Sequence, residues 1–320
     1  MTAAGALLAA EIAAHGPIPF RRFMEVALYH PEFGYYRRPH DPFGKEGDFF
    51  TAEQIQPVFG ILMAAWVRRC FEQMGRPADF QVVELGAGRG EMAEAFAEWP
   101  YTAIDLDRGA LPERFRGVVF SNEFFDALPV DVYCYRGGTF RKQLVDRKEE
   151  RFVWSEGPAA DRSAAGYLER WFPAPEEDRW YEVSADALGW LERAAHSLEA
   201  GYMLTIDYGY TRNEAIRFPR GTLMGYRRHT AREEVLDDPG ERDITAHVNF
   251  TALEGHGETL GLRKKNFQSL AQLLLEVGET DQFAAALAGD DLRRRMQLKT
   301  LLFGMGETFR VLTQVKGAGE

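Results

Sequence analysis

The stretch Val82-Val83-Glu84-Leu85-Gly86-Ala87-Gly88-Arg89-Gly90 decides the fold of this chain. Residues 81–85 are apolar enough for a short buried strand, and they run directly into three closely spaced glycines. Residues 91–99 then repeat apolar side chains at helical spacing. Glycines permit a tight turn and let a ligand approach the backbone. The segment therefore predicts a strand, a nucleotide-type loop and a helix.

The spacing of the glycines discriminates between ligands. They form GxGxG at 86, 88 and 90, whereas a dinucleotide fingerprint is GxGxxG, which weighs against a nicotinamide oxidoreductase. No GxxxxGK[ST] is present, which excludes an ATPase P-loop. Glu84 would repel a pyrophosphate and suits a cationic ligand such as S-adenosylmethionine, while Asp105 follows the next strand and can bind ribose hydroxyls. A tight turn without a ligand is the alternative.

Strand and helix patterns alternate from residue 80 onward. This alternation predicts an α/β fold with a mainly parallel, doubly wound sheet. The last strand alternates apolar and polar side chains, so we expect it to be half-exposed and antiparallel. Strands are expected at 81–85, 101–105, 117–121, 202–207, 262–267 and 308–316, and helices at 91–99, 185–198, near 250–260, and within 268–277 and 281–303.

The rest of the chain predicts a cap and an insertion. Helices are expected at 2–14 and 58–71, with a long loop rich in Gly, Pro and aromatic residues between them. Residues from about 131 to 182 are polar and mixed, which indicates a β-rich insertion. We therefore expect an N-terminal helical and loop cap at 1–75, and a second domain at 76–320 that carries the insertion.

Composition limits the partners. The 320 residues carry a net charge of -11, which argues against nucleic acid or an anionic membrane as the default partner. No run approaches the ~20 apolar residues of a transmembrane helix. The two cysteines, Cys70 and Cys134, form no CxxC, which excludes a disulfide framework and a thiolate zinc site.

The sequence also predicts no metal and a cytoplasmic location. No His, Asp and Glu residues share convincing metal-ligand spacing. The few cysteines suit a reducing compartment. The first sixteen residues contain Glu11 and no arginine, so they support neither a secretory signal nor a mitochondrial presequence.

Ordered motifs lie along nearly the whole chain, at residues 16–20, 30–36, 47–51, 59–60, 84–90, 122–130, 206–209, 221–223, 243–250 and 305–307. Together they resemble the MidA-like family of S-adenosylmethionine-dependent methyltransferases. The resemblance implies a class I methyltransferase fold, S-adenosylmethionine as cofactor and a protein side chain as acceptor. Arginine is the implied acceptor, as in the mitochondrial members that assist complex I assembly.

The resemblance and the strand ends together imply the site residues. Asn122 could instead cap a helix, and Asp48 could be a solvated loop acid. The expected acceptor-binding and catalytic residues are Glu123, Asp126, Asp207 and Tyr208. The expected cofactor-binding residues are Glu84, Gly86, Ala87, Gly88, Gly90, Asp105, Asn122 and Asp48.

One departure from the family pattern stands out. Only eleven residues, 106–116, separate the strand that ends at Asp105 from the next strand, which suffices for a single crossover. We therefore expect the sheet to lack one edge strand and the adenine pocket to be open. An inactive assembly or scaffold protein with this fold is the resulting alternative. The methyl acceptor and the oligomeric state are open from sequence.

Overall fold

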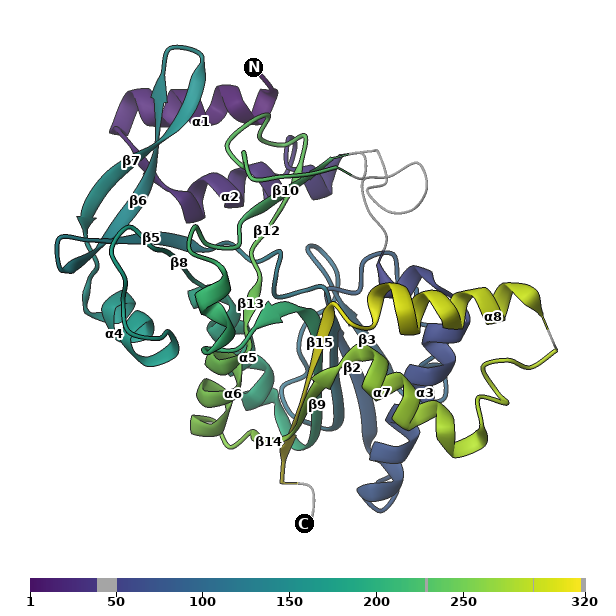
Figure 1. The fold of residues 1–320 in the computed structure, drawn as a ribbon. Helices are drawn as coiled ribbons and strands as arrows, with labels where there is room; N and C mark the ends of the chain where they lie inside the picture. Colours follow the sequence, from purple (N-terminus) through teal and green to yellow (C-terminus); the bar gives the residue numbers. More distant parts are fainter. Residues whose placement is uncertain (39–50, 228–229, 290, 318–320) are drawn as a thin grey trace. The chain divides into compact units, whose positions relative to one another are not determined.

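The computed structural model describes residues 1–38, 51–227, 230–289 and 291–317, and these divide into two compact units (Figure 1). Unit 1 comprises residues 1–50, 126–187 and 210–251, and unit 2 comprises 51–125, 188–209 and 252–320. These bounds differ from the expected cap at 1–75 and domain at 76–320. Asp48 lies outside the described residues.

Unit 2 contains the predicted doubly wound sheet. Its strands run in the order β14-β15-β9-β4-β2-β3. The pairs β2–β3, β2–β4 and β4–β9 are parallel, and β15 is antiparallel to both β9 and β14. The strand bounds are β2 Phe80–Leu85, β3 Tyr101–Ile104, β4 Phe115–Asn122, β9 Leu198–Tyr210, β14 Arg263–Ser269 and β15 Phe309–Lys316.

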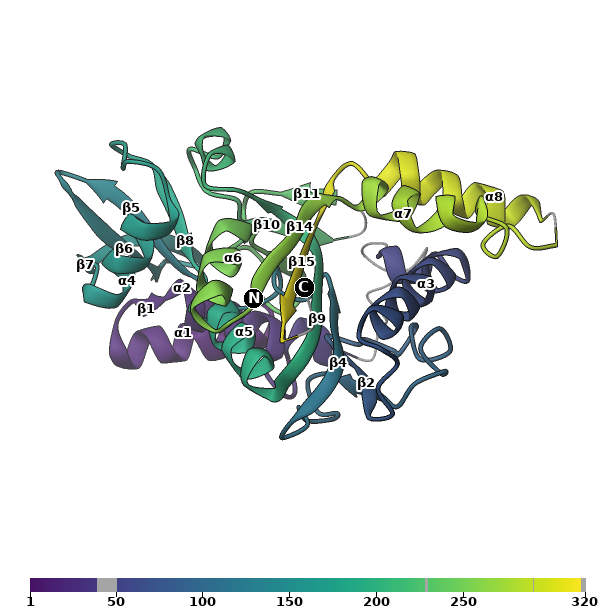
Figure 2. The same ribbon diagram turned by 90° about the horizontal axis from the view of Figure 1, so that it is seen from below.

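Helices cover both faces of this sheet (Figures 1 and 2). Trp66 of α3 packs edge-on against Tyr202 of β9, and buried leucines of α7 join the same apolar core. The capping box of Ser269 and Gln272 fixes the start of α7. The helices are α3 Val58–Gln73, α5 Ala185–Ser197, α6 Phe250–Thr259, α7 Leu270–Gly278 and α8 Leu292–Lys299, with short turns η2 Ala52–Gln54, η4 Glu279–Asp281 and η5 Thr300–Met305.

The sheet ends at β3, as the short connection predicts. Residues 105–114 are all described, and they contain no helix and no named strand. Asp105 and Arg108 instead close a tight turn through paired backbone hydrogen bonds of 2.9 and 3.1 Å. The expected loss of one edge strand is therefore confirmed.

Two local expectations for unit 2 were wrong. Residues 91–99 form successive turns with mixed i→i+3 and i→i+4 hydrogen bonds instead of the regular i→i+4 pattern of a helix, although Met92, Phe96 and Trp99 are buried. The strand β15 is mostly buried rather than half-exposed, because it lies between β9 and β14. Its polar Gln314 is buried as well.

Unit 1 holds the N-terminal helices and the β-rich insertion. Phe20, Phe23 and Met24 of α2 are fully buried in its core, which also includes Val132 and Val145 of the insertion strands. Its large sheet has the order β1-β6-β5-β8 with β7 paired to β6, and a smaller one has the order β11-β10-β12. The elements are α1 Ala3–His15, β1 Ile18–Pro19, α2 Phe20–Tyr29, η1 Tyr35–Arg37, β5 Asp131–Arg136, β6 Thr139–Lys148, β7 Arg151–Ala159, α4 Arg162–Trp171, β8 Trp180–Val183, η3 Glu214–Arg217, β10 Met224–Arg227, β11 Thr230–Arg232, β12 Asp243–Thr245 and β13 Val248–Asn249.

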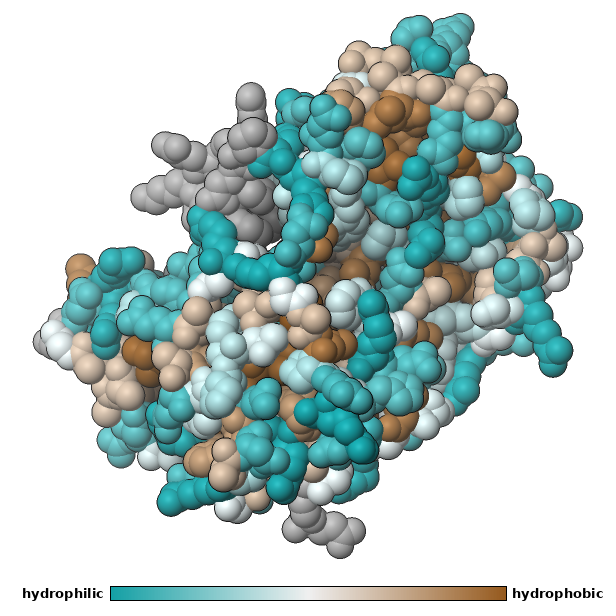
Figure 3. Space-filling view, turned by 180° about the vertical axis from the view of Figure 1, so that it is seen from behind, coloured by the Kyte–Doolittle hydropathy of each residue, from teal (hydrophilic) through white to brown (hydrophobic). Residues whose placement is uncertain are grey.

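The helices of the described residues include no candidate membrane span. Within the described ranges, no helix has the length and hydropathy that crossing a bilayer requires. On the face in Figure 3, hydrophilic residues cover most of the surface and hydrophobic ones lie in scattered groups between them.

Gly117 and Gly201 lie where the central strands approach one another closely, which gives a testable prediction. A Cβ on Gly117, which has φ +148°, would lie 1.9 Å from the Gln81 carbonyl oxygen of the neighbouring strand. We expect Gly117→Ala to lower the free energy of unfolding by about 2 kcal/mol or more, measured by urea denaturation. The control is Gly189→Ala on α5, where a Cβ meets nothing within 4 Å, and we expect it to be neutral or stabilising. Equal losses in both variants would contradict this account.

Candidate functional site

The glycine loop follows β2 and has the backbone that the sequence predicts. Gly86, Gly88 and Gly90 have φ values of +73°, +48° and +87°. A Cβ on Gly86 would lie 2.7 Å from the Phe124 ring, so the aromatic side chain can approach only because this residue is glycine.

Backbone amides of this loop donate their hydrogen bonds to acceptors within the protein. Gly86 N and Ala87 N both donate to the Ile104 carbonyl, at 2.9 and 3.1 Å, and Gly90 N donates to the Ala87 carbonyl at 2.7 Å. Gly88 N donates to Asp105 Oδ2 at 2.6 Å. A phosphate-binding loop must instead point its N–H groups at the anion. The observed hydrogen bonds therefore disfavour a pyrophosphate ligand, in agreement with the glycine spacing.

Asp105 lies at the end of β3, opposite the glycine loop. Its Oδ1 accepts from Leu106 N at 2.7 Å, and its other oxygen accepts from Gly88 N. Arg108 donates to the Gly88 carbonyl at 2.9 Å and fixes the same turn from the other side. Each carboxylate oxygen has a second lone pair, so Asp105 can still accept from hydroxyl groups of a ligand.

Glu84 ends β2 as a fully buried carboxyl group. Its Oε2 accepts a hydrogen bond from the Tyr101 hydroxyl, and no donor of the described residues reaches its Oε1. Burial raises the pKa of Glu84 to about 7. Glu53 from η2 hydrogen-bonds with Glu84, and burial together with the nearby Glu84 charge raises the pKa of Glu53 well above its usual range.

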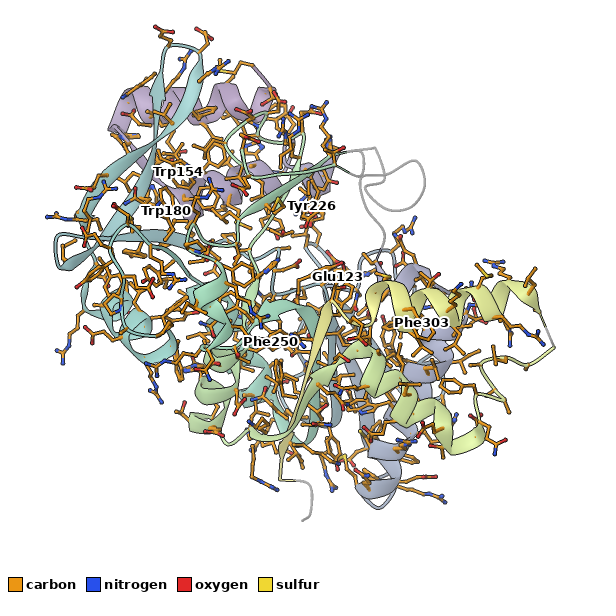
Figure 4. The ribbon with its side chains drawn as sticks, viewed as in Figure 1. Glu123, Trp154, Trp180, Tyr226, Phe250 and Phe303 are labelled. Atoms are coloured by element: carbon orange, nitrogen blue, oxygen red, sulfur yellow. The ribbon has the colours of Figure 1, made fainter. Side chains whose placement is uncertain are left out.

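Asn122 and Glu123 end β4 and bond to one another. Asn122 Nδ2 donates to Glu123 Oε1 at 3.1 Å, and Ala52 N donates to the same oxygen at 3.3 Å. No helix follows Asn122, so the alternative that it caps a helix is wrong. Glu123 has φ +51°, which is uncommon for a residue with a side chain and often marks functional sites. In Figure 4, Glu123 lies near the end of the sheet at which β15 begins.

Asp207 and Tyr208 follow on the neighbouring strand, β9. Asp207 is fully buried, and its oxygens accept from Phe125 N at 3.0 Å and Tyr208 N at 2.8 Å. This carboxylate thereby holds the turn that follows Glu123. The Tyr208 ring packs on Phe309, with the ring centroids 4.0 Å apart.

The structure thus brings most of the predicted residues to one edge of the sheet in unit 2. Asp126 belongs to unit 1, where its carbonyl accepts from Ala246 N at 2.9 Å and its side chain is buried. Sequence reasoning missed Glu53 and Tyr101. An acid on an irregular segment carries no periodic signal, although Glu53 lies in the long loop predicted between the first two helices.

This arrangement fits S-adenosylmethionine. The cofactor carries an ammonium, a sulfonium and a ribose diol. A buried carboxyl with an oxygen that no described donor reaches suits a cation, and an acid across a glycine loop suits the diol. Among the residues that the structure describes, no three His, Cys, Asp or Glu side chains are grouped to hold a metal ion.

Comparison with known proteins decides the family. A model of S-adenosyl-L-methionine-dependent methyltransferases matches residues 62–97 and 95–268. The chain belongs to this family. Two crystal structures from Burkholderia thailandensis superpose on it with TM-scores of 0.87 and 0.84, at 29% and 30% identity, covering 99% of this chain and 93% and 92% of theirs. The first of them is bound to S-adenosyl-homocysteine.

Curated relatives of this methyltransferase have a named activity. The protein arginine methyltransferase NDUFAF7 homolog, mitochondrial, of Drosophila melanogaster is 27% identical over 317 residues, covering 79% of this chain and 70% of the relative. The human protein arginine methyltransferase NDUFAF7, mitochondrial, is 27% identical over 306 residues, covering 76% and 66%.

These names correct the expected cytoplasmic location. The curated relatives are mitochondrial proteins, which contradicts that expectation. The cysteine count could not have given this location. A low count distinguishes reducing from oxidising compartments, but it does not distinguish one reducing compartment from another.

The raised pKa of Glu84 predicts how the stability of this methyltransferase depends on pH. The folded protein holds a proton on Glu84 up to about pH 7, whereas the unfolded chain releases it near pH ~4.3. The contribution of Glu84 to the free energy of unfolding is therefore largest below pH ~4.3. It falls as pH rises to about 7, with a slope of up to about 1.4 kcal/mol per pH unit.

We expect Glu84→Gln to reduce this slope, because glutamine binds no proton. Urea denaturation between pH 5 and 8 measures it. The control is Glu98→Gln, which removes an exposed carboxylate paired with Arg68. A wild-type slope retained in Glu84→Gln would show that Glu84 titrates normally in the folded protein.

Proposed function

We propose that this methyltransferase transfers the methyl group of S-adenosylmethionine to an arginine side chain of a protein. The observation that carries the proposal is the Glu123 carboxylate, held by Asn122 and the backbone of Ala52 at the carboxyl ends of the parallel strands. Ligands of open α/β sheets bind at this edge. The names of the curated relatives support arginine as the acceptor.

The residues around the glycine loop are the ones we assign to the cofactor. Gly86 and Gly88 have left-handed φ values, which glycine adopts without strain, and they form the tight turn beside the proposed cofactor. Glu84 would face the cationic part, and Asp105 the ribose hydroxyls. The proposed set is Glu84, Gly86, Ala87, Gly88, Gly90, Asp105 and Asn122, with Asp48 from the loop outside the described residues.

The acceptor is assigned to carboxylates at the ends of β4 and β9. When bound, S-adenosylmethionine supplies an electrophilic methyl group on a sulfonium. A guanidinium has to be aligned with it and has to lose a proton, since arginine is otherwise always charged. Glu123 can orient two N–H groups and accept that proton.

The remaining predicted residues are assigned supporting roles. Asp207 accepts two backbone amides and is fully buried, so we infer that it positions the Glu123 turn rather than taking a proton. Tyr208 would line the acceptor site beside it. Asp126 stays a proposed acceptor-binding residue from unit 1.

A protein is the partner that we infer from this chemistry. The net charge of -11 disfavours nucleic acid and suits a basic, arginine-bearing surface. The scaffold alternative rests on one observation, the sheet that ends at β3. The scaffold alternative predicts that function survives the loss of cofactor binding or of Glu123, because a scaffold needs neither.

We expect Glu123→Gln to lower the rate of methyl transfer by about 10²–10⁴-fold, because an amide cannot accept the proton. Purified protein with methyl-labelled S-adenosylmethionine and candidate acceptor proteins, followed by amino-acid analysis for methylarginine, measures the rate. Calorimetry should give an unchanged cofactor affinity for the variant.

The matched control is Glu94→Gln, an exposed carboxylate in the turns after the glycine loop, which should keep full activity. Full activity in Glu123→Gln would remove this residue from the reaction. Cofactor binding without methyl transfer to any protein would favour the scaffold alternative.

A further inference from the structure

Glu53 lies outside the glycine loop, yet the structure holds it against the end of β2. The short turn η2 is fixed at one end by the capping box of Thr51 and Gln54, and Ala52 N is fixed by Glu123 Oε1 at 3.3 Å. The Glu53 side chain is 6% exposed and reaches the buried carboxyl of Glu84. Two acidic groups thus share one buried space.

The surroundings of this pair provide little compensation for two negative charges. The titratable and charged groups recorded around it are Tyr101, Glu91, Glu123 and Arg108. Arg108 is the cation among them, and it already donates to the Gly88 carbonyl. Two close carboxyl groups in such a site cannot both ionise, so the pair holds one proton when nothing else is bound.

The pair and its neighbour also leave three acceptors without donors. No donor of the described residues reaches Glu53 Oε1, Glu84 Oε1 or Asn122 Oδ1, and all three side chains are more than nine-tenths buried. Asn122 is two residues beyond Phe120, the register partner of Glu84, so it lies on the same face of the sheet. An ammonium group has three N–H donors, which matches this set.

We propose that Glu53 and Glu84 together bind the ammonium group at the amino-acid end of the methyl donor, and that this cation displaces the proton that the two carboxyls share. The inference rests on the proposed cofactor site and adds Glu53 and a coupled proton to it. Before binding, one carboxyl of the pair is protonated and the other is ionised. After binding, both are carboxylates in contact with the ammonium of the ligand, and one proton has passed to water.

Proton release fixes the direction of the pH dependence. Binding strengthens as pH rises through the range in which the free pair still holds its proton, around pH 7 for Glu84. Above pH about 8 the amine of the ligand loses its own proton, which reverses the trend. The window for the test is therefore pH 6 to 7.5.

The experiment is calorimetric titration of S-adenosylhomocysteine into the purified full chain, in phosphate and in Tris at equal pH. The heat difference between buffers of different ionisation enthalpy gives the protons released. S-adenosylhomocysteine is chosen because its ammonium is its one cationic group. We expect release of up to one proton per ligand and affinity rising by up to about tenfold per pH unit. Methylthioadenosine, which lacks the amino-acid end, should release none.

One variant tests the role of Glu53. We expect Glu53→Gln to weaken binding of S-adenosylhomocysteine, because one of the two carboxylates that hold the ammonium is lost, while the buried Glu84 still releases its proton around pH 7. The control is Glu72→Gln on α3, an exposed carboxylate paired with Arg76, which should behave as the wild type.

Two outcomes would overturn the proposal and leave the proposed function intact. One is binding of S-adenosylhomocysteine to the wild type without proton release between pH 6 and 7.5. The other is a Glu53→Gln variant that binds S-adenosylhomocysteine as tightly as the wild type. Failure of the wild type to bind either S-adenosylmethionine or S-adenosylhomocysteine would instead overturn the cofactor site itself.

Discussion

The buried carboxyl of Glu84 is the constraint on which the site depends. A carboxyl group with no access to water must be neutral or must face a cation. The Tyr101 hydroxyl donates to one of its oxygens, and Glu53 hydrogen-bonds with the same carboxyl group. Around this group the glycine loop, η2 and the end of β4 are tied together by hydrogen bonds to Asp105 and Glu123. We propose that the same buried carboxyl prepares the protein for a positively charged ligand.

Much of the fold could be predicted from the sequence, because buried parallel strands are short apolar runs and their order follows from alternation with helices. The strands β2, β4 and β9 lie where the pattern predicts them, and the short connection after β3 predicts the missing strand. The irregular turns at 91–99 could not be predicted, since the burial of Met92, Phe96 and Trp99 has helical spacing whether or not the backbone closes a helix.

The candidate site was predictable wherever a residue ends a strand. Glu84, Asp105 and Asn122 lie at or within one residue of such ends, and Asp207 lies in β9 beside the end of β4. Glu53 could not be found in this way, because it enters the site from an irregular turn whose position depends on tertiary contacts. Sequence also gave no hint that both Asp207 oxygens accept backbone amides, since a carboxylate at a strand end can serve the backbone or a ligand equally well.

The sheet that ends at β3 has a consequence for the solution behaviour of the protein. An outermost strand leaves unpaired backbone N–H and C=O groups, which other chains can recruit into continuous sheets. Here that strand is only four residues long, its first three residues are partly exposed, and the Asp105–Arg108 turn ends it at once. So short an edge offers few hydrogen bonds to an incoming chain. The loss of the outer helix and strand therefore shortens the fold without creating a template for aggregation.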